Sequence, residues 1–206
     1  MTGTWKKRYR TTNGGRTWFL ASSAREREEL PGAYCRSEGY SPISFVTELV
    51  GYTIDESARL LVTRDGGFTF QPITSEPAGV WWIKFATEQF GWRVDDWRGK
   101  EGRLSATEDG GKTWRSVPLD ARVWAFDILP TGRGWVIGSL GSRSMLLSTG
   151  DGGQTWTHVD LGGVDVRAVE FVDDQHGWVF GGGPGDYRYR RLFRTADGGR
   201  SWTQLH

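Results

Sequence analysis

Carboxylates that recur at regular intervals are the residues of this chain with the clearest capacity for chemistry. The segment 107–114 reads TEDGGKTW, and four further segments read TTNGGRTW, TRDGGFTF, TGDGGQTW and TADGGRSW. A loop aspartate can bind calcium, act as a general acid, or accept hydrogen bonds from the backbone of its own turn. The Gly-Gly pair that follows supplies the positive φ values of a tight turn. We therefore predict a structural role, with no metal and no cofactor, for the residues at the third position: Asn13, Asp65, Asp109, Asp151 and Asp197.

These five segments, called the DGG turns below, are flanked by strand-forming residues. An apolar run such as 145–148 (MLLS) precedes the turn, and an aromatic residue with alternating polar and apolar residues follows it. This pattern is typical of a β-hairpin. The tryptophans that end the turns are predicted to pack against the next unit of the chain, and they are Trp18, Trp114, Trp156 and Trp202.

A second phrase recurs in phase with the DGG turns. It consists of Phe or Ile, five residues, and then a Gly-aromatic pair, and it begins at Phe45, Phe85, Ile128 and Phe171. The DGG turns themselves are separated by 52, 44, 42 and 46 residues. We predict four strands per unit: strand A ends at the Phe or Ile, strand B follows the Gly-aromatic pair, and strands C and D flank the DGG turn. Four short strands in a repeat of this length are typical of a propeller blade.

The DGG turns resemble the Asp-box, or BNR repeat, of β-propellers. The TxDGGxTW form is most similar to the photosystem II stability/assembly-factor family and its bacterial relatives. This resemblance implies an all-β fold of four-stranded antiparallel blades, a non-catalytic role in binding a protein partner, and export through an N-terminal signal.

The repeat predicts one propeller domain over residues 1–206, with four complete blades and an N-terminal half-blade. We expect a half-blade at 1–21, a loop insert at 22–39 with a helical turn near 24–30, and blades at 40–74, 75–118, 119–160 and 161–206. Three alternatives stay open for the incomplete first blade. The chain is part of a larger propeller, it closes as a five-bladed ring with a thin first blade, or two copies associate and complete each other.

Arginines are concentrated in the predicted loops between strands B and C. These loops are 55–59, 95–103, 138–144 and 181–191, and each contains Arg. Arginine binds carboxylates in a bidentate manner, and Tyr and Trp are common anchors of protein interfaces. The alternative is that these arginines are solvated and pair with neighbouring acids. The predicted partner-binding residues are Trp97, Arg98, Arg143, Tyr187, Arg188, Tyr189, Arg190 and Arg191.

Composition narrows the range of partners and compartments. The formal net charge of +1 gives no support for a nucleic-acid partner, and no stretch is apolar enough for a membrane span. Cys35 is the single cysteine, so no intrachain disulfide is expected. The first residues lack the apolar core of a signal peptide, which favours the cytoplasm, whereas the family resemblance favours export if residues precede Met1.

The sequence leaves two classes of function. The first is a scaffold or assembly factor that binds a protein partner through its B–C and D–A loops. The second is a carbohydrate-binding or sialidase-like glycoside hydrolase propeller. Sialidases share the repeat and use three arginines, but the Arg-Ile-Pro motif that starts their catalytic domain is absent here, and Glu170 and Tyr189 belong to no recognisable constellation. We therefore expect a non-catalytic protein.

Overall fold

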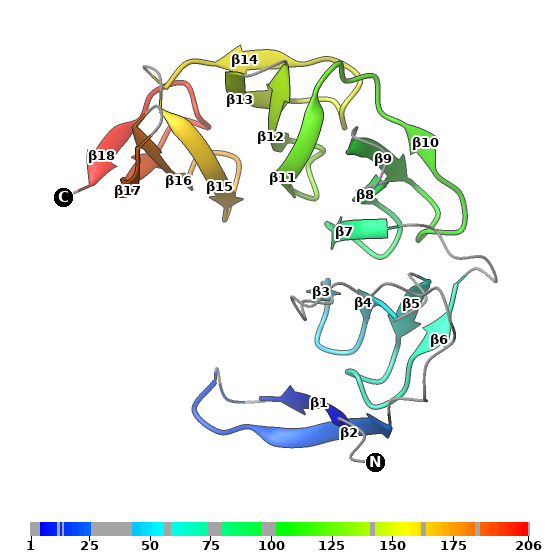
Figure 1. Ribbon diagram of the computed structural model, residues 1–206. Coiled ribbons are helices and arrows are strands. Elements are labelled where there is room, and N and C mark those ends of the chain that lie inside the picture. Colours follow the sequence, from blue (N-terminus) through cyan, green and yellow to red (C-terminus); the bar gives the residue numbers. More distant parts are fainter. Residues whose placement is uncertain are drawn as a thin grey trace. The chain divides into compact units, whose positions relative to one another are not determined.

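Every regular element in the described part of the chain is a β-strand. The computed structural model describes residues 5–11, 13, 15–25, 43–55, 59–73, 80–95, 102–140, 143–161, 164–183 and 186–205. Among these residues, four sheets have four strands each and one sheet has two (Figure 1). This confirms the predicted fold class, all-β with four antiparallel four-stranded sheets.

The strands follow the order of the sequence within each sheet, so each sheet is an antiparallel meander. We number the sheets one to five along the chain. Their strands are, in the first sheet, β1 (Trp5–Arg10) and β2 (Phe19–Arg25); in the second, β3 (Ile43–Phe45), β4 (Gly51–Ile54), β5 (Leu60–Thr63) and β6 (Gln71–Pro72); in the third, β7 (Val80–Phe85), β8 (Gly91–Asp95), β9 (Arg103–Thr107) and β10 (Arg115–Ser116); in the fourth, β11 (Arg122–Ile128), β12 (Gly134–Leu140), β13 (Arg143–Thr149) and β14 (Thr157–Val159); in the fifth, β15 (Asp165–Phe171), β16 (Gly177–Gly183), β17 (Asp186–Thr195) and β18 (Thr203–Leu205).

The chain divides into two compact units, residues 1–83 and residues 84–206. The second unit contains two apolar clusters. One surrounds Trp92 and Phe126, and the other surrounds Trp135 and Phe171. Each cluster takes residues from two successive sheets, so apolar contacts between the inner faces of neighbouring sheets are the main source of its stability.

The tryptophans of the Gly-aromatic pairs, not those of the DGG turns, make the most deeply buried contacts between sheets. Trp135 of β12 is fully buried and stacks on Phe171 of β15 with ring centroids 3.3 Å apart. Trp114 and Trp202, by contrast, contact the strand-A phenylalanine of their own sheets. Trp156 contacts Trp92 of the preceding sheet, with ring centroids 5.6 Å apart. The ring contacts of these three tryptophans are thus within a sheet or with the preceding sheet, and packing against the next unit stays a prediction.

The B–C connections of the fourth and fifth sheets are shorter than predicted. Residues 138–140 and 143–144 are paired in β12 and β13, and residues 181–183 and 186–191 belong to β16 and β17. Much of each predicted loop is thus the end of a long hairpin. Similarly, β2 continues to Arg25, so the start of the predicted insert 22–39 is strand, and the helical turn expected near 24–30 lies largely outside the described residues.

Candidate functional site

Each DGG turn is closed by hydrogen bonds within the turn itself. In the turn 107–114, the Asp109 carboxylate accepts hydrogen bonds from the Thr113 backbone N–H at 2.9 Å and from the Thr113 hydroxyl at 2.6 Å. The buried Thr107 hydroxyl donates to Asp109 and accepts from the Gly111 N–H at 2.9 Å. Both glycines of this turn have positive φ, 76° and 89°, which an L-residue rarely adopts.

The same bonds recur at Asp65, Asp151 and Asp197. In each case the hydroxyl of the residue four positions later donates to the carboxylate at 2.6 Å. In the first turn Asn13 takes the place of the acid and donates to the Thr17 hydroxyl at 2.8 Å. A neutral amide therefore closes the turn with the same partner residue.

Hydrogen bonding to the ionised form lowers the pKa of the turn carboxylates. The hydroxyl and then the backbone N–H of Thr113 lower the pKa of Asp109 to about 2, and those of Thr69 do the same for Asp65. The pKa values of Asp151 and Asp197 lie well below their usual range, chiefly through the hydroxyls of Thr155 and Ser201. These carboxylates remain ionised at neutral pH, so none of them carries a proton to donate as a general acid.

Two substitutions in one turn should have different effects. Thr107→Val removes the acceptor of the buried Gly111 N–H, and we expect a loss of about 1–3 kcal/mol in the free energy of unfolding. Asp109→Asn should be tolerated, because Asn13 closes its turn with an amide. Urea unfolding followed by tryptophan fluorescence checks both. An equal loss for the two variants would contradict this account of the turn.

The lowered pKa values also predict a pH dependence. Because the folded pKa of Asp65 and Asp109 is about 2 against 3.8 for the free group, their contribution to stability is complete above pH 4 and is lost as the pH falls toward 2. The urea concentration at the midpoint of unfolding should therefore decrease as the pH is lowered from 4 to 2. It should decrease less in a variant that carries Asn at positions 65 and 109.

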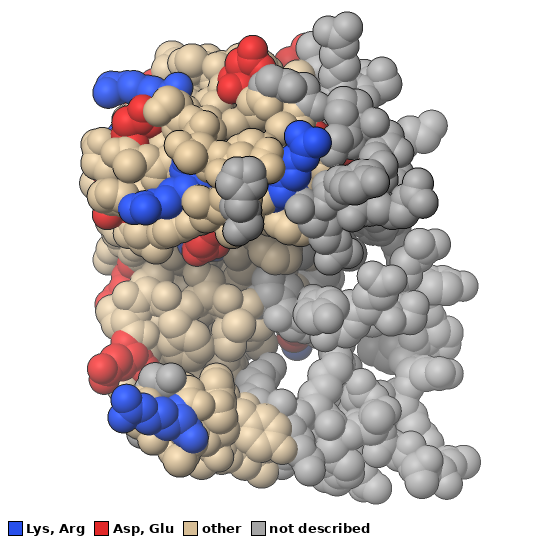
Figure 2. All heavy atoms as spheres, turned by 90° about the vertical axis from the view of Figure 1, so that its left-hand side faces the viewer, with Lys and Arg blue, Asp and Glu red and all other residues tan. Residues whose placement is uncertain are grey.

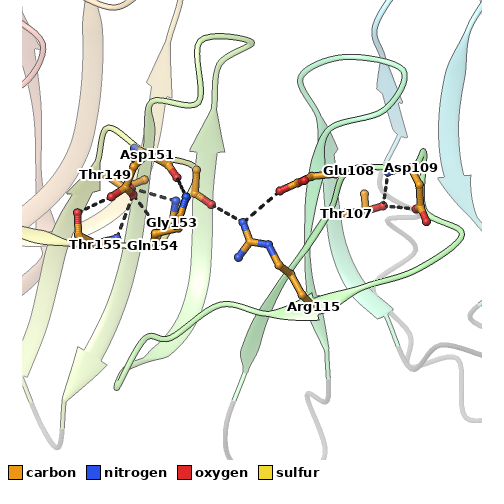
Figure 3. A network of polar contacts seen from close by, with 10 residues as sticks. Thr107, Glu108, Asp109, Arg115, Thr149, Asp151, Gly153, Gln154 and Thr155 are labelled. Atoms are coloured by element: carbon orange, nitrogen blue, oxygen red, sulfur yellow. Dashed lines mark hydrogen bonds and ion pairs between the residues drawn. The ribbon is translucent and has the colours of Figure 1, made fainter.

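The DGG turns also hold the sheets together at one edge. Within a sheet, the first glycine N–H of the turn donates to the A–B turn, as from Gly110 to the Gln89 carbonyl at 2.9 Å. Between the third and fourth sheets, the Arg115 guanidinium donates to the Gly152 carbonyl at 3.3 Å. Within the third sheet, the same guanidinium lies 3.6 Å from the Glu108 carboxylate (Figure 3). Between the fourth and fifth sheets, Arg133 donates to the Gly198 carbonyl at 3.2 Å. We call this the turn edge, and its polar groups are largely engaged in structural bonds.

A charged cluster connects the first strands of the third, fourth and fifth sheets. Asp127 of β11 is fully buried, and its carboxylate contacts the Lys84 ammonium at 2.5 Å and accepts from the Phe171 N–H at 2.6 Å. Lys84 also lies 3.2 Å from the exposed Glu170. Burial lowers the pKa of Lys84, but the charges and hydrogen bonds of Asp127 and Glu170 outweigh that effect and raise it. We call these three residues the inner-strand cluster.

Sequence reasoning missed the inner-strand cluster, although a signal was available. Lys84, Asp127 and Glu170 each stand one residue before the Phe or Ile that ends strand A. A charged residue at the same position of three successive apolar strands is unusual enough to suggest mutual pairing.

The predicted partner-binding residues lie mostly on the two long hairpins. Arg143 opens β13, and Tyr187, Arg188, Tyr189, Arg190 and Arg191 lie on β17, where Arg191 is exposed. Trp97 and Arg98 lie outside the described residues. On the face in Figure 2, the described cations and anions are interspersed.

The ladder between β16 and β17 is interrupted among these residues. Arg190 pairs with Gly182, but the next pair toward the hairpin end is Asp186 with Gly183. Tyr187, Arg188 and Tyr189 therefore have no partner residue in the register of β16. The corresponding hairpin β12–β13 pairs without interruption up to Leu140 and Arg143.

The described residues contain no group of three or more His, Cys, Asp or Glu side chains arranged to hold a metal ion. Within that same part of the chain, no helix is long and apolar enough to cross a membrane.

No family model and no curated protein matches this chain. Several solved structures are similar to it. A GH74 xyloglucanase from Xanthomonas campestris superposes with a TM-score of 0.54 at 17% identity, over 76% of this chain and 28% of the enzyme. YCF48 from Cyanidioschyzon merolae superposes with a TM-score of 0.50 at 16% identity, over 96% of this chain and 77% of that one. A structure of YCF48 bound to D1 peptide has a TM-score of 0.47 at 18% identity, with coverages of 96% and 75%.

The fold is that of a β-propeller. The neighbours belong to this class, and the four antiparallel four-stranded sheets fit it. The chain spans little more than a quarter of the xyloglucanase, 28%. At these identities the similarity establishes the fold alone.

Proposed function

We propose that this chain is an Asp-box propeller of the YCF48-like type, and that it acts as a non-catalytic scaffold that binds a protein partner. The binding site is at the edge opposite the turn edge, where strands B and C meet. In an antiparallel meander the A–B and C–D turns lie at one end of the strands and the B–C connection at the other. One YCF48 structure holds a bound D1 peptide, which is a property of that protein.

The interrupted ladder of the β16–β17 hairpin carries this proposal. Its three residues without a β16 partner, Tyr187, Arg188 and Tyr189, are of the aromatic and arginine types that dominate protein interfaces. Bulges of this kind occur near functional sites. We call residues 186–191 the arginine hairpin.

Glycines opposite the arginine hairpin strengthen the argument. Arg190 and Arg191 pair in register with Gly182 and Gly181, so these β16 positions carry no side chain that could compete for the arginines. Arginines in this arrangement suit a carboxylate-bearing segment, which they bind in bidentate manner. The turn edge is a poorer candidate, because its carboxylates and its Arg115 and Arg133 are already engaged.

Charge reversal tests the site. The variant Arg188→Glu, Arg190→Glu, Arg191→Glu should lose a partner protein that the tagged wild-type chain captures from a lysate of the source organism. The control variant Arg16→Glu, Lys112→Glu, Arg200→Glu changes the net charge equally at three exposed positions of the DGG turns and should retain it. Loss of capture by both variants, or by neither, would move the binding site elsewhere.

A carbohydrate-active propeller is the second candidate, and the fold similarity to a GH74 xyloglucanase favours it. The exposed Glu170 of the inner-strand cluster is the carboxylate that such an activity would draw on. Binding on a glycan panel, or release of reducing sugar from xyloglucan, that disappears in Glu170→Gln would replace the scaffold proposal.

A further inference from the structure

The first strand of the fifth sheet carries an ion pair that is open to water. On β15 the Arg167 guanidinium donates to the Asp165 carboxylate at 2.5 Å, and the two side chains are 46% and 25% exposed. Ion pairs of this kind contribute little to stability, because water screens the charges and the side chains lose conformational entropy. A carboxylate from another molecule can therefore replace Asp165 at Arg167 with little cost to the fold.

The fold does not require this ion pair. Both β11 and β15 shift register after their second residue, so the third residue of each strand forms a bulge. In β11 the first and third residues are Arg122 and Trp124, which cannot form an ion pair with each other. In β15 the same positions are Asp165 and Arg167. Since the bulge forms with either set of residues, the ion pair is not a requirement of the strand geometry.

Asp165 lies in register with the arginine hairpin. It pairs with Gly182 of β16, and Gly182 pairs with Arg190 of β17 on its other side. Adjacent strands are about 4.8 Å apart, so the backbones at positions 165 and 190 are about 10 Å apart, and an extended segment covers that distance with about three residues. The glycine between them has no side chain to block the way. A partner segment that lies on the arginine hairpin and crosses β16 therefore reaches Arg167.

We propose that Asp165 occupies, in the free protein, the position of a partner carboxylate, and that an acidic segment of the partner displaces it from Arg167 on binding. This inference rests on the proposed function, because it extends the site from the arginine hairpin onto β15. Arg167 then adds a contact, and Asp165 adds selectivity. A segment with a single acid cannot engage the hairpin and also displace Asp165, so Asp165 favours partners whose acidic residues continue beyond the hairpin.

A labelled acidic peptide tests the proposal through a double-mutant cycle. The probe is fluorescein-labelled hexaglutamate, and fluorescence anisotropy gives its Kd for the full chain. Asp165→Asn should lower the Kd about fivefold, because Asp165 no longer competes for Arg167. In a chain that already carries Arg167→Gln, the same change should lower the Kd less than about twofold, since there is no guanidinium to release. A general effect of one lost negative charge would instead lower the Kd equally in both backgrounds.

The matched control is Glu108→Gln, which removes one exposed acid at the turn edge and should leave the Kd unchanged. Hexaglutamine, the neutral analogue of the probe, should not bind. Equal gains from Asp165→Asn in the two backgrounds would overturn this inference. The same holds if neither the wild-type chain nor the Asp165→Asn variant binds hexaglutamate. Thermal melting of each variant establishes that it is folded.

Charge reversal of the arginine hairpin separates this inference from the proposed function. We expect the variant Arg188→Glu, Arg190→Glu, Arg191→Glu to lose hexaglutamate, and the effects at positions 165 and 167 to be coupled. If the hairpin variant loses the peptide while the effects at 165 and 167 are additive, the proposed function stands and the role of Asp165 is wrong. Binding that survives the hairpin reversal would overturn the proposed function and this inference with it.

Discussion

Replacing Asp127 with alanine should cost about 3–5 kcal/mol in the free energy of unfolding, one of the two largest effects that we expect in this chain. Asp127 is 0% exposed and is in contact with the Lys84 ammonium and with the Phe171 N–H. Its removal leaves the partly buried Lys84 ammonium with the exposed Glu170 as its remaining acidic neighbour, and it deprives the buried Phe171 N–H group of its acceptor. Urea unfolding at neutral pH, followed by tryptophan fluorescence, measures the loss.

The paired variant determines whether the unpaired charge is the cause. Lys84→Met with Asp127→Leu removes both charges and should be less destabilised than Asp127→Ala, because replacing a whole buried ion pair with apolar groups is often close to neutral. Lys84→Met alone should resemble Asp127→Ala, because it leaves the buried carboxylate unpaired. A loss below about 1 kcal/mol for Asp127→Ala would show that the inner-strand cluster does not hold the three sheets together.

Replacing Trp135 with alanine should also cost about 3–5 kcal/mol. The Trp135 ring is fully buried and stacks on Phe171 of the next sheet with an interplanar angle of 4°. Its loss opens a cavity between the fourth and fifth sheets that the surrounding strands cannot close. Urea unfolding again provides the measurement.

Trp202 is the matched control for Trp135, because it contacts the same Phe171 edge-on but is only half-buried. We expect Trp202→Ala to cost clearly less than Trp135→Ala. The reverse order would support the interpretation drawn from the sequence, in which the tryptophans of the DGG turns provide the packing between units.

The repeat made most of the fold predictable from the sequence. The predicted strands at 80–85 and 60–63 agree with β7 and β5 at both ends, because apolar runs bounded by the DGG turn and the Gly-aromatic pair leave little freedom in where a strand begins or ends. The D strands are shorter than predicted: the segment 113–117 contains only β10, Arg115–Ser116. The DGG turn uses Thr113 to bind Asp109, so this residue is not available for the ladder.

The candidate site was less predictable, for two physical reasons. The Arg-rich segment 181–191 has the glycines of a loop, but Gly181 and Gly182 are paired in a hairpin, and only the register shows which residues leave the ladder. The inner-strand cluster depends on contacts between strands more than 40 residues apart, since Lys84, Asp127 and Glu170 are 43 residues apart along the chain. Local patterns cannot reveal such contacts unless the repeat is aligned and each position is compared between units.

Photo-cross-linking tests the central claim, that the arginine hairpin is the protein-binding site, most directly. A photo-reactive phenylalanine analogue is placed at Tyr189 in one variant and, as a control, at the exposed Phe68 of a DGG turn in another. We expect a defined partner protein to be cross-linked from position 189 and not from position 68, and the product to disappear when Arg188, Arg190 and Arg191 are reversed in charge. A product from position 68 alone, or one that survives the charge reversal, would contradict the claim.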